Sequence, residues 1–100
     1  HGTHGSLVKD NVLYNHLSHG YFIEDGNEHN NVFEHNLGML THRSFSMLSS
    51  DQTPATFWIR NPQQFFRHNH AAGSSDFGFW FDTFGPAQKL EIREFFNNTA

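Results

Sequence analysis

The sequence repeats a six-residue phrase three times, and this repetition restricts the possible folds more than any other feature. Each copy begins with a small residue, continues with three large apolar residues and ends with two polar ones, at residues 20–25, 56–61 and 78–83. The third position is aromatic in every copy: Phe22, Trp58 and Trp80. The fifth is charged in every copy: Glu24, Arg60 and Asp82. A repeat of this kind indicates one supersecondary unit used several times.

A second phrase, an apolar residue followed three positions later by asparagine, is interleaved with the first. Its asparagines are Asn11, Asn36, Asn69 and Asn98, at steps of 25, 33 and 29 residues. Two strand phrases per repeat, with little helical periodicity, predict an all-β right-handed parallel β-helix of about four coils. Residues 1–100 then form one β-helix segment, in which 42–54 is a loop that leaves the repeat, 70–75 is a tight turn and 90–98 is a closing strand.

Equivalent residues of successive coils lie directly above one another in a β-helix. The sequence therefore predicts a ladder of stacked rings from Phe22, Trp58 and Trp80, each burying apolar surface worth about 1.5–3 kcal/mol. It also predicts an amide ladder from the four asparagines, because asparagine tolerates the left-handed conformation of a sharp corner and its amide both donates and accepts. The charged column can form a third ladder or remain solvated.

The composition excludes several classes of protein. With 12 Phe, 2 Trp and 2 Tyr the chain is too aromatic for a disordered segment, and its frequent polar residues interrupt any membrane span. A net charge of −4 gives no reason to expect a nucleic-acid partner. There is no cysteine for a disulfide or a thiolate metal site. Because the chain begins without Met and ends within a repeated phrase, we expect it to be a fragment of a larger protein. The remainder of that parent chain would then be one of its binding partners.

Residues 18–26, Ser-His-Gly-Tyr-Phe-Ile-Glu-Asp-Gly, resemble a Gly-His-x-Phe-Phe-x-Glu-Asp-Gly phrase of the fibrocystin, fibrocystin-like and cell-surface hyaluronidase family. Further similar segments follow in the family's order at 35–41, 55–62 and 71–74, and Gly78-Phe79-Trp80 closes the series. Ser18 stands where the family usually has glycine. The resemblance implies a parallel β-helix in a secreted or cell-surface protein, often on cilia or at matrix contacts. It does not settle activity, because a fold does not determine a function.

The densest group of reactive side chains surrounds the first phrase: His19, Glu24, Asp25 and Glu28, with His1 and His4 one coil earlier. His19, Glu24 and Asp25 are candidate catalytic residues, since glycosidic cleavage usually needs a general acid and a base. His1, His19 and Glu24 are candidate ligands of a divalent cation such as calcium. The alternative is structural, with Asp25 in a turn, Glu24 in the charge ladder and His19 at a strand end. As neighbours in a strand, Glu24 and Asp25 should point to opposite faces.

Two further features lie beside the asparagine ladder. His35 and His68 share the position before a ladder asparagine and can stack as a pair. Residues 97–99, Asn-Asn-Thr, form an N-glycosylation acceptor sequence. Since Asn98 would belong to the ladder, we expect Asn97 to point outward and to be the residue that carries a glycan.

Two functions fit these observations. The first is a structural or adhesive β-helix segment of a large extracellular or ciliary-surface protein, in contact with a polysaccharide such as hyaluronan or with other matrix and surface proteins. The second is part of a β-helix enzyme that depolymerises hyaluronan. Aromatic side chains exposed along one groove would favour sugar binding, whereas aromatic side chains wholly inside the coil would favour a rod. The sequence offers no complete acid–base pair, so we favour the first function and leave open whether the protein is an enzyme.

Overall fold

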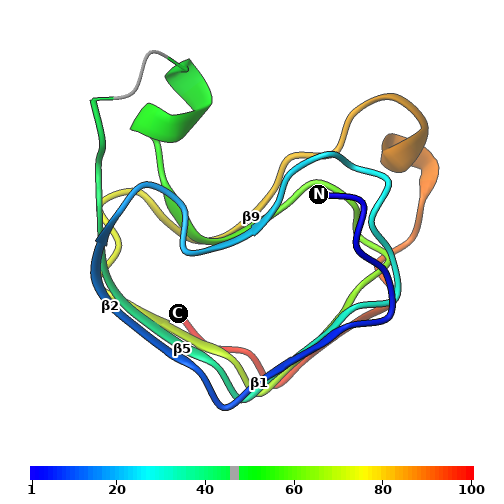
Figure 1. Ribbon diagram of the computed structural model, residues 1–100, viewed down its shortest axis with the longest axis horizontal. Helices are drawn as coiled ribbons and strands as arrows, with labels where there is room; N and C mark the ends of the chain where they lie inside the picture. Colours follow the sequence, from blue (N-terminus) through cyan, green and yellow to red (C-terminus); the bar gives the residue numbers. More distant parts are fainter. Residues whose placement is uncertain (46–47) are drawn as a thin grey trace.

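The chain winds into stacked coils, each built from three short parallel strands. The computed structural model describes residues 1–45 and 48–100, so positions 46–47 of the predicted excursion lie outside the described residues. Viewed down the coil axis, successive coils superimpose closely (Figure 1). All strand pairs of the described residues are parallel. The predicted all-β parallel β-helix is confirmed.

Three sheets run along the coil axis. Sheet A contains β1 (Leu7–Lys9), β4 (Val32–Glu34), β7 (Phe65–Arg67) and β10 (Glu94–Phe96). Sheet B contains β2 (Val12–Leu17), β5 (Leu37–His42) and β8 (His70–Ala72). Sheet C contains β3 (Tyr21–Ile23), β6 (Ala55–Ile59) and β9 (Phe77–Phe81). Two short 3₁₀ helices, η1 (Ser49–Gln52) and η2 (Gly85–Lys89), lie in segments that leave the coil.

The prediction of two strands per coil was wrong, because each coil has three. Sheets A and B meet at a corner of only two residues, so a strand of each reads as one continuous phrase in the sequence. The predicted turn at 70–75 begins with β8, and the closing strand predicted over 90–98 is confined to β10. Short strands with a two-residue corner between them carry too little pattern for their ends to be read from the sequence.

The left-handed corner residues are not the ladder asparagines, contrary to the prediction. They are the residues immediately before them, with φ values of 58°, 54°, 55° and 53°: Asp10, His35, His68 and Asn97. The asparagine amides instead point inward and connect the coils. The side-chain oxygen of Asn36 accepts the backbone N–H of Asn11 at 3.1 Å, and that of Asn69 accepts the backbone N–H of Asn36 at 3.0 Å. The ladder of Asn11, Asn36, Asn69 and Asn98 is therefore continuous in this structure.

The aromatic core lies on the inner sides of sheets A and C. On sheet C, Phe57 stacks between Tyr21 and Phe79 with ring centroids 4.6 Å away on either side. On sheet A, Phe33 and Phe66 stack at 4.8 Å. The sheet C rings come from the positions next to the predicted aromatic column, and Phe57 is fully buried. Each such ring contributes about 1.5–3 kcal/mol of hydrophobic stabilisation, which is the main force that holds successive coils together.

Candidate ligand-binding face

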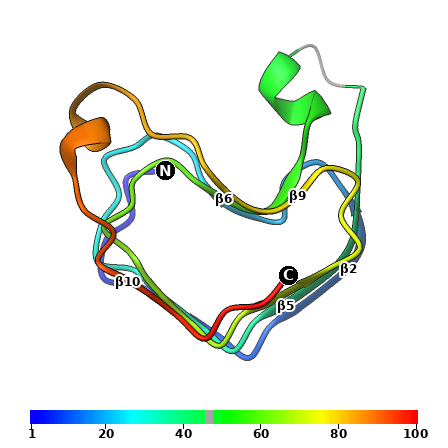
Figure 2. The same cartoon turned by 180° about the vertical axis from the view of Figure 1, so that it is seen from behind.

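The outer face of sheet C lies between the two segments that leave the coil. The segment with η1 joins β5 to β6, and the segment with η2 joins β9 to β10. Both project on the same side of the coil, one at each end of the sheet C strands (Figures 1 and 2). We call this surface the sheet C face and define it by its outward residues, Phe22, Trp58, Trp80, Glu24, Arg60 and Asp82.

The predicted aromatic column is in register and faces outward, a direction that the sequence left open. Phe22 pairs with Trp58, and Trp58 with Trp80, on neighbouring strands. Phe22 is 43% exposed and Trp80 38% exposed, whereas Trp58 is 5% exposed. The ring centroids are 6.4 Å and 6.3 Å apart, wider than in the stacked inner column. A third exposed ring, Phe77, packs against Trp80 with the ring centroids 4.5 Å apart.

His19 covers Trp58 and attaches the η1 segment to the sheet C face. Its side chain is only 2% exposed, and its ring lies 4.1 Å from that of Trp58. Nδ1 accepts the backbone N–H of Ala55 at 3.2 Å, so the proton of the neutral ring is on Nε2. Nε2 faces the carboxylate of Asp51 in η1 at 3.5 Å without a hydrogen bond. Burial lowers the pKa of His19 below its ordinary value, and the nearby Asp51 carboxylate offsets part of that effect.

Glu24 and Asp25 lie away from this contact and share a different imidazole. Nε2 of His1 is 2.8 Å from Glu24, and Nδ1 of the same ring is 3.0 Å from Asp25. Because β3 ends at Ile23, Glu24 and Asp25 do not alternate as strand residues do, and the prediction that they point to opposite faces was wrong. Glu28 is buried and accepts the backbone N–H groups of Asp25 and Gly26, which makes it a turn residue.

The three candidate catalytic residues therefore do not form one site. Among the described residues, His19 accepts a hydrogen bond from Ala55, faces Asp51 and packs against the aromatic column, whereas no direct hydrogen bond or ion pair joins it to Glu24 or Asp25. The Glu24 carboxylate acts on the His19 pKa through its charge, which raises it slightly against the lowering effect of burial. A general acid and base must both reach the same substrate atoms. The buried His19 ring and the exposed pair Glu24 and Asp25 do not provide this arrangement.

One group of described residues has the composition of a metal site. Ligand atoms of His1, Glu24 and Asp25 lie within 4.8 Å of one another. His19, a predicted ligand, is outside this group. Calcium takes six to eight oxygen ligands, whereas the group offers one nitrogen and two carboxylates, so it suits calcium poorly. Its imidazole already bonds both carboxylates, which gives the cluster a structural explanation without an ion.

The charged column is only partly paired. Arg60 donates to Asp82 at 2.7 Å, and its guanidinium lies 4.6 Å from the ring centroid of Phe84. Glu24 makes its ion pair with His1 and not with Arg60. A longer chain of alternating charges, which sequence reasoning missed, crosses the outer side of sheet A through Lys9, Glu34, Arg67 and Glu94. Lys9, Glu34 and Arg67 share the position two residues before a ladder asparagine and pair in register, so the repeat contained a signal for this chain of charges. Glu94 does not share that position, because the residue in register with Arg67 is Phe96.

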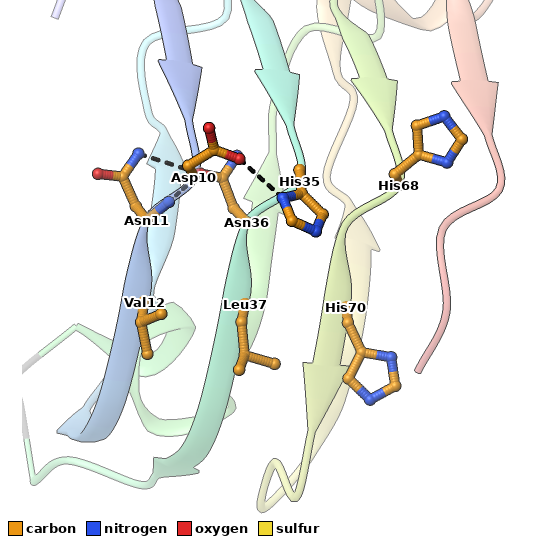
Figure 3. Close-up of a pocket in the computed structure, with 8 residues that line it drawn as sticks. All are labelled: Asp10, Asn11, Val12, His35, Asn36, Leu37, His68 and His70. Carbon is orange, nitrogen blue, oxygen red and sulfur yellow. Dashed lines mark hydrogen bonds and ion pairs between the residues drawn. The ribbon is translucent and has the colours of Figure 1, made fainter.

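A shallow groove of about 510 Å³ follows the corner between sheets A and B (Figure 3). Asn11 and Asn36 of the ladder line it, together with the residues on either side of the first three ladder positions: Asp10, Val12, His35, Leu37, His68 and His70. The predicted stacking of His35 on His68 is absent from the described residues. His35 bonds Asp10 at 2.7 Å, and His68 bonds Asn97 at 2.7 Å, so each imidazole pairs with a neighbouring coil.

The fold defines the class of this protein: a parallel β-helix segment with a stacked aromatic core and an amide ladder. The family model described as CEMIP beta-helix matches residues 1–53 and, in a second match, residues 43–100. Together the two matches cover the whole chain, so the chain belongs to the CEMIP β-helix family, as the resemblance predicted.

Individual relatives include both branches of the predicted family. The chain is similar to Fibrocystin-L of Mus musculus, at 42% identity over 100% of the chain and 3% of the relative. It is similar to the cell migration-inducing and hyaluronan-binding protein of Homo sapiens, at 31% identity over 100% of the chain and 10% of the relative. It is also similar to a cell surface hyaluronidase of Danio rerio, at 35% identity over 98% of the chain and 10% of the relative.

The chain thus spans a tenth or less of the length of these relatives. No solved structure matches it significantly. Within the described residues, no helix has the length and apolar character needed to cross a lipid bilayer.

Proposed function

We propose that this chain is a structural and adhesive β-helix segment of a large cell-surface or extracellular protein, and that the sheet C face is its polysaccharide contact. The observation that carries the proposal is the outward aromatic column, with Phe22 and Trp80 exposed beside the flanking η1 and η2 segments. Aromatic rings offer flat apolar surface that sugar rings can cover, and exposed aromatic groups often mark binding sites. Two relatives are named for hyaluronan, which makes it the first polysaccharide to test.

The charge of the face predicts how such binding should behave. Glu24 and Asp82 carry negative charge there, and the guanidinium of Arg60 is already paired with Asp82. An acidic polymer therefore gains little from ion pairing at this face, and its affinity must come from contact with the rings. We expect the affinity to change little between low and moderate salt, in contrast to binding that depends on basic patches.

Binding of hyaluronan oligosaccharides to the full-length protein tests this proposal. Replacing Trp80 or Phe22 with alanine should weaken binding about 2- to 10-fold each, since a ring contact contributes about 0.5–1.5 kcal/mol. Tyr14→Ala is the matched control, because Tyr14 is 65% exposed but lies on sheet B. The proposal fails if Trp80→Ala, Phe22→Ala and Tyr14→Ala all bind like the wild type.

The second candidate function, hyaluronan cleavage, rests on the names of the relatives and not on an assembled set of catalytic groups. If Glu24 and His19 are catalytic, Glu24→Gln and His19→Ala should each abolish depolymerisation by the full-length protein. Wild-type cleavage by both variants would remove these residues from the mechanism and leave the adhesive role. A ciliary location remains a prediction from the resemblance, and immunofluorescence of the full-length protein would test it.

A further inference from the structure

Neither the proposed polysaccharide contact nor the packing of the coil requires the N-glycosylation acceptor sequence at residues 97–99. It is the single Asn-x-Ser/Thr sequence in the chain, and it contains two adjacent asparagines. The structure separates their environments. The side-chain oxygen of Asn98 accepts the backbone N–H of Asn69 at 3.0 Å, and its amide donates to the Phe66 carbonyl at 2.9 Å. Asn98 is therefore occupied by the ladder.

Asn97 has the opposite orientation because its backbone is left-handed, with φ of 53°. Its side chain is exposed and makes its hydrogen bond to His68, another exposed residue, at 2.7 Å. An N-linked sugar replaces one of the two amide hydrogens of asparagine, so the remaining N–H can still donate to His68. A glycan on Asn97 would leave the ladder intact.

Asn97 is exposed because of its position within the coil, and not merely because it lies in the last coil of the described residues. The equivalent residues of earlier coils are Asp10, His35 and His68, which have the same left-handed backbone. The side chains of Asp10 and His35 are 59% and 74% exposed. His68 has a coil on either side of it and is exposed as well. A further coil stacked beyond Asn97 would therefore still leave its side chain in solvent.

We propose that Asn97 is an N-glycosylation site, which the secretory route of a cell-surface protein would allow. The co-reactant is an oligosaccharide joined through C1 to a lipid pyrophosphate. The amide nitrogen of Asn97 forms a bond to C1, the bond from C1 to the pyrophosphate oxygen breaks, and the lipid pyrophosphate leaves with the bonding electrons. The amide nitrogen gives up one proton to a base of the transferase, and no oxidation or reduction takes place.

The position determines what the glycan shields. Asn97 follows β10 of sheet A, and Thr99 pairs with His70 at the start of β8 in sheet B. The glycan therefore leaves the coil at the corner groove of Figure 3, while sheet C forms the remaining side of the coil. It would cover the groove at His68 and leave the sheet C face open. Removing the glycan should not weaken polysaccharide binding at that face.

The test is direct glycopeptide analysis of the full-length protein secreted from a eukaryotic cell line. After trypsin cleavage at Arg93, peptide N-glycosidase in heavy-oxygen water should convert Asn97 to labelled aspartate. Asn97→Gln and Thr99→Val should abolish the label, and Thr99→Ser should retain it. Asn30→Gln is the matched control, because Asn30 is exposed and left-handed (φ 59°) but has no acceptor sequence.

An unmodified Asn97 peptide from correctly secreted wild-type protein would overturn the proposal without involving any variant. That result would leave the proposed polysaccharide contact untouched, since the sheet C face is tested by Trp80→Ala. Conversely, a glycan on Asn97 together with unaltered binding by both Trp80→Ala and Phe22→Ala would support this site and refute the other.

Discussion

Asn36 provides the sharpest test of the amide ladder, because its side chain is buried between two coils. Its oxygen accepts from the backbone N–H and the side-chain amide of Asn11 at 3.1 and 3.0 Å. Its amide donates to the Val8 carbonyl at 2.9 Å and to the side-chain oxygen of Asn69 at 3.0 Å. Asn36→Leu removes all four hydrogen bonds while approximately preserving side-chain volume.

The cost can be worked out from the partners that remain. The Asn69 oxygen keeps the backbone N–H of residue 36, and the exposed side-chain amide of Asn11 can turn to water. The Val8 carbonyl and the Asn11 N–H lose partners inside the coil. At about 1–3 kcal/mol for each unsatisfied buried group, with some water reaching the first coil, we expect Asn36→Leu to destabilise β4 and β5 by about 2–4 kcal/mol.

Hydrogen exchange is the suitable assay, since a large multidomain protein seldom unfolds in one step and exchange reports local opening. A loss of about 2 kcal/mol or more should lower amide protection in β4 and β5 roughly 30-fold or more. Asn11→Leu is the control, because Asn11 is exposed and its loss leaves the oxygen of Asn36 bonded to a backbone N–H. It should cost less than about 1 kcal/mol. Equal protection in the two variants, both correctly folded, would refute the ladder argument.

Three further perturbations test other parts of the coil. An alanine Cβ at Gly38 would lie 2.1 Å from Cγ2 of Thr56, so Gly38→Ala should destabilise the coil by at least about 1–3 kcal/mol. The amide protection of β5 and β6 should fall accordingly, and Thr56→Ser should restore part of it. Ser18 has φ of 64°, so Ser18→Gly should stabilise the coil by about 0.5–1 kcal/mol in the same assay. Unchanged stability of this variant would show that the backbone of Ser18 is not strained. The lowered pKa of His19 means that the unfolded chain binds more protons as pH falls below the ordinary value of 6.5, so stability is present above that pH and is lost toward the folded-state pKa. The protection factors at β6, which are corrected for the slower intrinsic exchange at lower pH, should therefore fall on mild acidification, and His19→Gln should reduce that fall.

The register of the coils could be predicted where the same residue type recurs at the same position. The pairing of Trp58 with Trp80 and the connection of Asn36 to Asn69 both followed from identical residues in repeated phrases. The same reasoning missed a second amide stack, in which the backbone N–H of Asn31 donates to the side chain of Gln64 at 3.0 Å. In that stack an asparagine in one coil and a glutamine in the next make equivalent hydrogen bonds with side chains of different length. Because the residue types differ, the sequence shows no repeat at this position.

Sheet B was not predicted as a separate sheet, because its three strands share almost no residue types at equivalent positions. Residue Gly38 of β5 pairs with Ala71 of β8, and both face the interior. Small residues are required there because Thr56 and Tyr21 from sheet C already fill the space beside Gly38. The requirement is set by contacts across the coil and not by neighbours in the chain. Hydrophobic alternation, which depends on sequence neighbours alone, could not reveal it.

The direction of the aromatic column was undetermined for a related reason, and its solution bears on function. Residues 21–23, like 57–59 and 79–81, are apolar at consecutive positions, so alternation cannot say which face is inside. The coil buries Tyr21, Phe57 and Phe79 and leaves the other column outward. The η1 segment and His19 then cover Trp58, but Phe22 and Trp80 remain exposed. Because large exposed rings favour association over solvation, this incomplete covering is the physical reason to look for a ligand on the sheet C face before any other surface.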